Sequence, residues 1–176
     1  MPMLWFNPDP RFVIELSGLH VSRSLRKVLR QQRFEIRFDS AFSRVVAACA
    51  APRSDESGTW IDHRIAPAFV ALHEMGGLDG VRAHSVEAWR EGVLVGGLYG
   101  IAVGGVFSGE SMFMRESNAS KVALVALVER MIARGFTLLD CQVYTEHFES
   151  MGGIEVARAE YLSHLEAVVD HDCRLV

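Results

Sequence analysis

The middle of the chain holds a run of residues that limits the folds available to it. Residues 83–90, 93–103 and 106–114 form three consecutive stretches rich in strand-forming residues. The pairs Glu91-Gly92 and Gly104-Gly105 separate them, and short pairs with glycine favour tight hairpin turns. We therefore predict an antiparallel meander of three strands, in which the glycines of residues 93–103 introduce a break or a bulge.

The segments on either side of this meander add helices and further strands. Residues 118–134 are amphipathic and end at Gly135, which predicts a helix with a glycine stop signal. Strands are also predicted at residues 12–16, 34–38 and 136–143, helices at 22–32, 41–51, 61–75, 144–151 and 158–169, and a polar loop at 51–58. A meander, then a helix, then a strand is an α+β order. We expect a mixed, mostly antiparallel sheet flanked by helices, in a single domain over residues 1–176.

Polar residues interrupt two of the apolar strands. In FTLLDCQV (residues 136–143), Asp140 and Gln142 are two positions apart, so we expect them on one face with Cys141 opposite. Glu110 stands in an otherwise apolar strand, which is costly unless the carboxylate is paired or hydrated. Glu110 either faces solvent or approaches Asp140 from a neighbouring strand, where such a pair would orient an amine or share a proton.

Charge is unevenly distributed along the chain. The net charge is −4, but residues 1–64 have a balance of +3 and residues 65–176 a balance of −7. Residues 20–37 carry six basic side chains against one acidic side chain. The helix predicted there turns Leu25, Val28 and Leu29 inward and its basic residues outward. This face is either simply solvated or a contact surface for nucleic acid phosphates.

Several classes of protein do not fit this sequence. Three cysteines without metal-site spacing favour a reducing compartment. No apolar run is long enough for a membrane span, and the first residues do not resemble a secretory signal, so we expect a cytoplasmic protein. The histidines show no partners at metal-ligand spacing, so we expect no metal. Serine-hydrolase, P-loop and kinase motifs do not occur.

The stretch RESNASK (residues 115–121) lies between a predicted strand and the start of the central helix. Unpaired N–H groups and the helix dipole favour anions there. The element order resembles the acetyltransferase-like (GNAT) architecture, whose members place an R-x-x-G-x-G/A loop here for a cofactor pyrophosphate. Asn118 replaces the first of these glycines, and its bulk argues against acyl-CoA. Alternatively, Asn118 or Ser117 is only a helix cap.

Seven stretches, in order along the chain, resemble the leucyl/phenylalanyl-tRNA protein transferase family. They are WFNPDPR (5–11), LHVSRSLRK (19–27), GTWI (58–61), AHSVEAWR (83–90), GGLYGIAVGGVFSGESMF (96–113), ESNASK (116–121) and LLDCQV (138–143). Members of this family begin with a further small domain, so the resemblance implies a short form that lacks it. It also implies the GNAT fold, with aminoacyl-tRNA as co-substrate and no other cofactor.

The resemblance implies an activity. Family members take Leu or Phe from the 3′ end of an aminoacyl-tRNA and join it to the N-terminal Arg or Lys of a protein, which marks that protein for degradation. Asp140 would hold or deprotonate the incoming α-amino group, or pair with the basic N-terminal residue. Gln142 would form a hydrogen bond at the reacting carbonyl, and Glu110 would join this network.

Two further sets of residues follow from the resemblance and from charge. The pocket for the apolar side chain and the terminal adenosine would be lined by Trp60, Leu98, Phe107, Ser111 and Asn118. The candidates for contact with the tRNA acceptor stem, assigned on charge more than on motif, are Arg23, Arg26, Lys27 and Arg30.

Other functions stay open at this point. One is a related transferase with a different peptide or amine acceptor. Another is a non-catalytic domain that recognises basic N-termini or RNA, although the presence of Glu110, Asp140 and Gln142 argues against an idle site. A further alternative is an acyl-CoA acetyltransferase.

Overall fold

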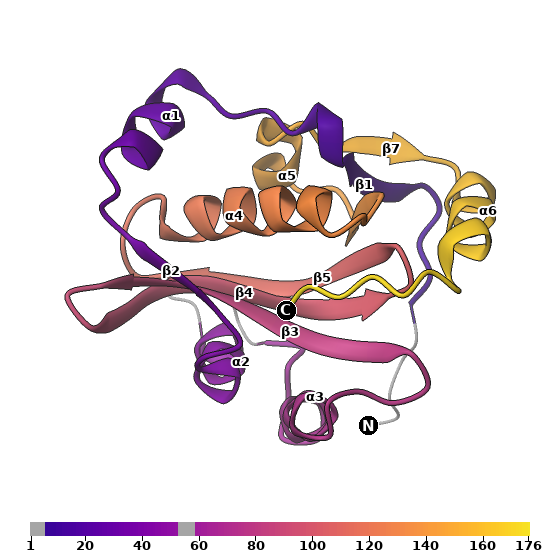
Figure 1. The fold of residues 1–176 in the computed structure, drawn as a ribbon, viewed down its shortest axis with the longest axis horizontal. Coiled ribbons are helices and arrows are strands. Elements are labelled where there is room, and N and C mark those ends of the chain that lie inside the picture. Colours follow the sequence, from indigo (N-terminus) through magenta and orange to yellow (C-terminus); the bar gives the residue numbers. More distant parts are fainter. Residues whose placement is uncertain (1–5, 53–58) are drawn as a thin grey trace.

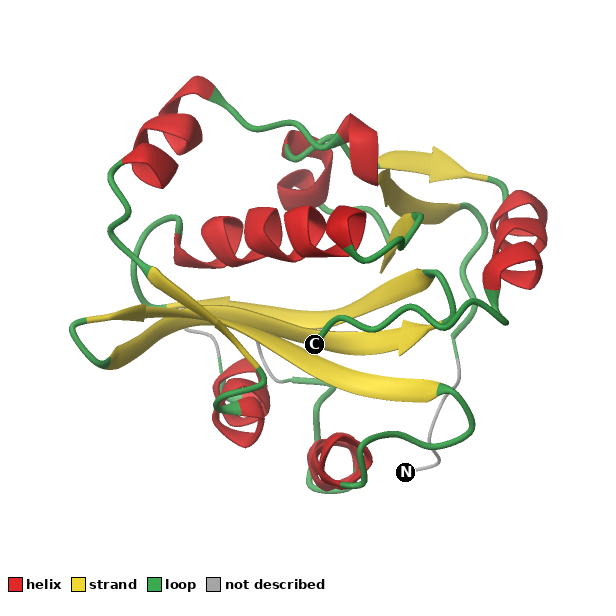
Figure 2. Ribbon diagram, viewed as in Figure 1, coloured by secondary structure: helices red, strands yellow, loops and turns green. Residues whose placement is uncertain are grey.

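The fold is built on a single sheet with helices on both of its faces (Figures 1 and 2). The structure is a computed structural model that describes residues 6–52 and 59–176. Its strands are β1 (Arg11–Glu15), β2 (Glu35–Phe38), β3 (Val81–Arg90), β4 (Val93–Val103), β5 (Val106–Met114), β6 (Leu138–Gln142) and β7 (Ile154–Val156). Its α-helices are α1 (Arg23–Arg30), α2 (Phe42–Ala50), α3 (Ile65–Glu74), α4 (Ala119–Ala133), α5 (Glu146–Ser150) and α6 (Arg158–Val168), with a 3-10 turn, η1 (Leu16–Gly18).

The sheet is antiparallel except at one place. The strand order is β2-β3-β4-β5-β6-β1-β7, and only β5 and β6 run parallel. The predicted meander is confirmed as β3, β4 and β5. The parallel pair is short: it extends from Val106 opposite Leu138 to Ser108 opposite Asp140. Beyond this point the two strands no longer pair with each other, so the sheet opens between them.

The helices form two layers around the sheet. Figure 1 shows α1, α4 and α5 on one side and α2 and α3 on the other, with α6 beside the end made by β1 and β7. The larger core lies between α4 and the sheet and includes the fully buried Leu127 and Met131. A second core, around Tyr99, lies between the sheet and the pair α2 and α3. Across the described ranges, no helix has both the length and the apolar character needed to cross a membrane.

The central helix α4 is less amphipathic than its sequence predicts. Most of its residues are buried, from Ala119 in the first turn to Met131 in the last. One side packs on the sheet, while α1 and the 3-10 turn cover another. Arg130 stays near the surface and donates a hydrogen bond of 3.1 Å to the carbonyl of Leu175. A helix covered on several sides can be apolar around most of its circumference.

Several predicted boundaries differ from the structure. The helix predicted at 61–75 begins only at Ile65, because the Asp62 carboxylate accepts hydrogen bonds from the backbone N–H groups of Arg64 and Ile65. Pro67 therefore lies in the first turn, where it leaves no hydrogen bond unmade. The short strand β7 and the turn η1 were not predicted. Most of the predicted polar loop, residues 53–58, lies outside the described residues.

Gly96 sets how closely α4 approaches the sheet. A Cβ atom built at Gly96 would lie 2.5 Å from the Cβ of Ala119 and 3.0 Å from its carbonyl carbon. Real Cβ contacts are longer, so any side chain here would push the first turn of α4 away from β4.

We predict that Gly96→Ala lowers the free energy of unfolding by about 1–3 kcal/mol because of this overpacking. The measurement is urea unfolding at one pH. Gly18→Ala is the matched control, because its new Cβ would meet nothing closer than 3.7 Å. Equal stability of the two variants would contradict the tight contact between Gly96 and α4.

Candidate active site

A cleft opens where β5 and β6 part. Its volume is about 880 Å³, within the range of small-molecule sites. The lining residues come from β4, the end of β5, β6 and the segment after it, α4, α5, the end of α2 and Trp60. The floor is apolar, with Leu98, Leu124 and Leu127, while Glu110 and Gln142 supply polar groups. The cleft therefore combines an apolar surface with a few polar groups at the carboxyl ends of two parallel strands, a usual place for ligands.

A bulge in β5 brings Glu110 to this cleft. Tyr99 of β4 pairs with Ser111, but the next residue, Gly100, pairs with Gly109, so Glu110 is an extra residue in β5. A bulge of this kind bends a strand and re-aims its side chains. Its effect is visible beyond Glu110, because Phe107 packs in the α4 core whereas Phe113 packs against the second core. Simple alternation would have placed those two rings on the same face.

The surroundings of Glu110 favour its protonated form. Burial, assisted by the negative charge of Asp140, raises the pKa of Glu110 to about 7. A hydrogen bond with Gln142 and the positive charge of Arg11 act in the opposite direction. A carboxyl group with a pKa near the working pH can both accept and donate a proton during a reaction.

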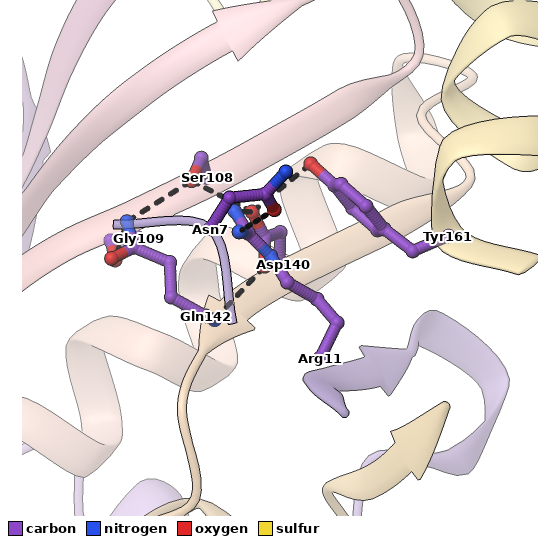
Figure 3. Close-up of polar contacts among 7 residues, drawn as sticks. All are labelled: Asn7, Arg11, Ser108, Gly109, Asp140, Gln142 and Tyr161. Atoms are coloured by element: carbon purple, nitrogen blue, oxygen red, sulfur yellow. Dashed lines mark hydrogen bonds and ion pairs between the residues drawn. The ribbon is translucent and has the colours of Figure 1, made fainter. Parts of the chain in front are cut away.

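Asp140 lies behind the wall of the cleft and is fully buried. Its carboxylate accepts five hydrogen bonds, most of which Figure 3 shows. Arg11 donates two of them, at 2.9 Å to Oδ1 and 2.6 Å to Oδ2. The hydroxyl of Ser108 donates at 2.9 Å, that of Tyr161 at 3.1 Å, and the backbone N–H of Gln142 at 2.9 Å. Both carboxylate oxygens therefore point at protein donors.

Gln142 connects this buried cluster to the cleft. Its φ is 66°, in the left-handed region that a residue other than glycine adopts only when its surroundings hold it there. The bond from its N–H to Asp140 provides such a restraint. Its Nε2 donates to the Ser108 hydroxyl at 3.3 Å and to the Gly109 carbonyl at 3.4 Å. The carboxamide of Gln142 is thereby fixed at the wall of the cleft.

The predicted arrangement of the D-C-Q stretch is confirmed in part. Asp140 and Gln142 both reach the hydroxyl of Ser108. Cys141 is buried in the α4 core, on the other side from Asp140, and it lines the cleft together with Gln142. Burial raises the pKa of the Cys141 thiol well above its usual value, so this cysteine is not a thiolate nucleophile.

The residues predicted for the pocket do not all meet there. Trp60, Leu98 and Ser111 line the cleft. Phe107 does not: it is fully buried in the α4 core, beneath Gly100, where a Cβ would lie 2.5 Å from its ring. Asn118 occupies the N-cap position of α4 in a left-handed conformation and does not line the cleft either. Its side chain makes no capping bond and instead donates to Ser117 at 3.3 Å.

The basic residues predicted for tRNA contact lie on the exposed face of α1. They are Arg23, Arg26, Lys27 and Arg30. Ser22 caps the helix as predicted, accepting a hydrogen bond from the N–H of Leu25 at 3.2 Å, and Leu25 is buried. The first turn contains no acidic residue, so the charge of Arg23 opposes the helix dipole there. Lys27 and Arg30 lie in the last turn, where a positive charge complements the dipole, so only Arg23 is unfavourably placed for the helix.

Four residues near the cleft were not predicted from the sequence. Arg11 and Ser108 stand within stretches that carry the family resemblance, which was the available signal. Tyr161 lies in α6, far along the chain, and nothing in its neighbourhood indicated a contact with Asp140. His147 lines the cleft, and burial, with the nearby charge of Lys121, lowers its pKa, so it is a neutral imidazole at neutral pH. Among the described residues, no group of His, Cys, Asp and Glu is arranged to hold a metal ion.

Comparison with known proteins shows the family. The sequence profile described as Leucyl/phenylalanyl-tRNA protein transferase matches residues 13–166. This chain belongs to that family. A relative named leucyl/phenylalanyl-tRNA--protein transferase from Aromatoleum aromaticum is 54% identical over 93% of this chain and 67% of its own length. Another from Pseudomonas fluorescens is 49% identical over 99% of this chain and 75% of its own length.

The similarity to solved structures concerns the fold only. L-PGS from Bacillus licheniformis matches with a TM-score of 0.51 at 13% identity, covering 82% of this chain and 51% of that one. A functionally unknown conserved protein from Staphylococcus epidermidis gives a TM-score of 0.50 at 12% identity, covering 84% and 57%.

Glu110 should make stability depend on pH. Its pKa in the folded protein, about 7, is above the ordinary value of 4.5, so ionisation destabilises the folded state as pH rises between these values. Glu110→Gln removes this penalty. We expect the variant to be more stable than the original chain at pH 8, on the order of 1 kcal/mol, and nearly equal at pH 5.

Urea unfolding at the two pH values measures this difference. The exposed Glu129 provides the control, since Glu129→Gln should change stability little at either pH. A Glu110→Gln variant with the same stability difference at pH 5 and pH 8 would contradict the raised pKa.

Proposed function

We propose that this chain is an aminoacyltransferase that takes Leu, Phe or a similar apolar residue from aminoacyl-tRNA and joins it to the N-terminal amine of an acceptor protein. The observation that carries the proposal is the meeting of Glu110 and Gln142 at one cleft in a chain of this family. The acceptor is proposed to begin with Arg or Lys, and the addition to mark it for degradation. Aminoacyl-tRNA is the co-substrate.

The fold is proposed to be acetyltransferase-like (GNAT), with residues 1–176 as a single catalytic domain. The parting of the parallel strands β5 and β6 beside the central helix α4 supports this assignment. Asn118, at the start of α4, stands where that fold uses a glycine to admit a pyrophosphate. The bulk of this residue favours aminoacyl-tRNA over acyl-CoA as the donor.

The chemistry needs little more than orientation and a proton acceptor. The amine nitrogen attacks the ester carbonyl, a C–N bond forms, and the bond from the carbonyl carbon to the ribose oxygen breaks. The amine loses a proton and the ribose oxygen gains one. Holding amine and ester together supplies at most about 7–11 kcal/mol of the barrier reduction, and a positioned base contributes about 10²–10⁴-fold.

Glu110 is the residue best suited to move this proton. It lines the cleft, and its pKa of about 7 allows it to accept the proton from the amine and return it to the ribose oxygen. Asp140 was expected to act on the amine directly. Its five hydrogen bonds to protein donors favour an indirect role instead, through the position of Gln142.

The rest of the cleft is assigned to the aminoacyl-adenosine end of the tRNA. Leu98, Leu124 and Leu127 form an apolar surface for the Leu or Phe side chain. Trp60 is half exposed at the rim and offers a ring on which the adenine can stack. The basic face of α1 is assigned to the phosphates of the acceptor stem.

A transfer assay tests the function. Radiolabelled Leu-tRNA or Phe-tRNA is mixed with the chain and with a peptide that begins with Arg or Lys. We expect label on the peptide, and an approximately 100-fold loss of kcat in Gln142→Ala, because the carboxamide at the reacting carbonyl is gone.

Gln32→Ala is the matched control for this variant. Gln32 is also a glutamine with a positive φ, 45°, but it is exposed at the end of α1. It should retain normal transfer. Label on peptides that begin with other residues would point to a different acceptor. Normal turnover by Gln142→Ala would overturn the assignment of the site.

The tRNA surface is tested by charge reversal on α1. Arg26→Glu combined with Lys27→Glu should weaken binding of aminoacyl-tRNA and reduce the slope of log K against log salt by about 2, since two phosphate contacts are lost. Filter binding over a salt series measures both effects. Arg134→Glu with Arg174→Glu makes the same change in net charge elsewhere. If the two double variants behave alike, the α1 face is only a solvated surface.

A further inference from the structure

The Asp140 carboxylate is held from the side away from the cleft by two residues that have no assigned role in the reaction. Arg11 comes from β1 and Tyr161 from α6 (Figure 3). Together they supply three of the five hydrogen bonds that this carboxylate accepts. Any role of these two residues in the reaction rests on the proposed function of the cleft.

Arg11 holds Asp140 in a fixed orientation. Its side chain is 12% exposed, and its Nε and Nη2 atoms each bond a different carboxylate oxygen. Paired bonds of this kind fix both the position and the plane of a carboxylate. The guanidinium also lies 4.6 Å from the centre of the Tyr161 ring, which orients it further.

Tyr161 completes the arrangement. It is buried, and its hydroxyl donates to Oδ2 of Asp140 at 3.1 Å. Burial, together with the Asp140 charge, raises the pKa of Tyr161 to about 12, so its hydroxyl keeps its proton and remains a donor. The hydroxyl of Ser108 donates to the same oxygen.

Two contacts link Asp140 to Gln142: the backbone N–H of Gln142 donates to Oδ1, and the Ser108 hydroxyl donates to Oδ2 and accepts from the Gln142 carboxamide. Oδ1 accepts both Arg11 Nε and the backbone N–H of Gln142, each at 2.9 Å. The left-handed φ of Gln142 is unfavourable for a residue other than glycine. If Oδ1 of Asp140 shifted, the backbone of Gln142 would no longer be held in this conformation. Its carboxamide, which lines the cleft, would then lose its fixed direction.

We propose that Arg11 and Tyr161 are positioning residues for the transfer reaction: they fix the Asp140 carboxylate, which in turn holds the Gln142 carboxamide in its working orientation. Neither residue lines the cleft. Their loss therefore acts on the rate of the reaction and not on the binding of aminoacyl-tRNA. A purely structural role, in which they only tie β1 and α6 to the sheet, would lower stability and leave Gln142 as it is.

The test uses two conservative variants of the full chain, Arg11→Lys and Tyr161→Phe. Lysine keeps the charge but loses the paired bonds, and phenylalanine keeps the ring but loses the hydroxyl. We expect kcat to fall about tenfold in Tyr161→Phe and by about 10–100-fold in Arg11→Lys, with KM for aminoacyl-tRNA changed by less than about twofold. The second readout is the side-chain amide signal of Gln142 in 15N NMR of the free protein, identified by its loss in Gln142→Ala.

Two exposed pairs provide the controls. Tyr144→Phe removes a hydroxyl that donates to Glu149 at 2.9 Å, and Arg174→Lys alters an ion pair with Asp172. Both should leave kcat and the Gln142 signal unchanged. Lower kcat together with a shifted Gln142 signal in Arg11→Lys and Tyr161→Phe supports the proposal.

The other outcomes either overturn the positioning role of Arg11 and Tyr161 or distinguish its failure from a failure of the proposed function. Unchanged kcat in both variants, or reduced kcat with an unshifted Gln142 signal, would overturn the positioning role. If the unaltered chain shows no transfer to any acceptor, the proposed function fails. The NMR signal of Gln142 then decides the positioning role alone: a shift in both variants supports it, and an unshifted signal overturns it.

Discussion

A single buried carboxylate joins the parts of this molecule that meet at the cleft. Asp140 of β6 accepts hydrogen bonds from Arg11 of β1, Ser108 of β5 and Tyr161 of α6. It stands opposite Ser108, at the last paired position of the parallel strands. On one side of this position the sheet is continuous, and on the other it opens. The cluster around Asp140 therefore fixes the place where the cleft begins.

Such a cluster is a costly way to stabilise a fold. A buried ion pair loses the hydration of both partners, and apolar residues of similar volume often stabilise a protein at least as well. The cost is offset here because each oxygen of Asp140 is matched by donors. What the cluster adds is a fixed orientation for the groups bonded to it.

Two features at the cleft depart from regular strand structure: the bulge at Glu110 and the left-handed backbone of Gln142. Departures of this kind concentrate at functional sites.

The parts of the fold that depend on local pattern could be predicted from the sequence. The meander, the capped helix α1 and the shared side of Asp140 and Gln142 all follow from periodicity and turn residues. Phe107 was assigned to the pocket from the family resemblance, but its ring is fully buried in the α4 core and does not reach the cleft. Asn118 was assigned to the pocket from its place in the loop, but its side chain turns to Ser117.

Contacts between distant elements could not be predicted in this way. Arg11 and Asp140 are separated by 129 positions, and Tyr161 reaches Asp140 only because α6 packs beside β1 and β6. A hydrophobic pattern specifies which face of an element is buried but not which polar group it meets. The late start of α3 has a similar origin, since Asp62 competes for the first N–H groups of the helix.

The two carboxylates near the cleft have different surroundings, and the proposed function gives them different roles for this reason. Asp140 has a cation and several donors around it, so its negative charge is compensated and its atoms are committed to the protein. Glu110 lies on the cleft side of the same network with fewer compensating contacts, and its pKa rises to about 7. In the reaction proposed above, the transferred proton goes to Glu110, because this group lines the cleft and can hold a proton at neutral pH. The charge of Asp140 contributes to this division, because it is one reason why the pKa of Glu110 is raised.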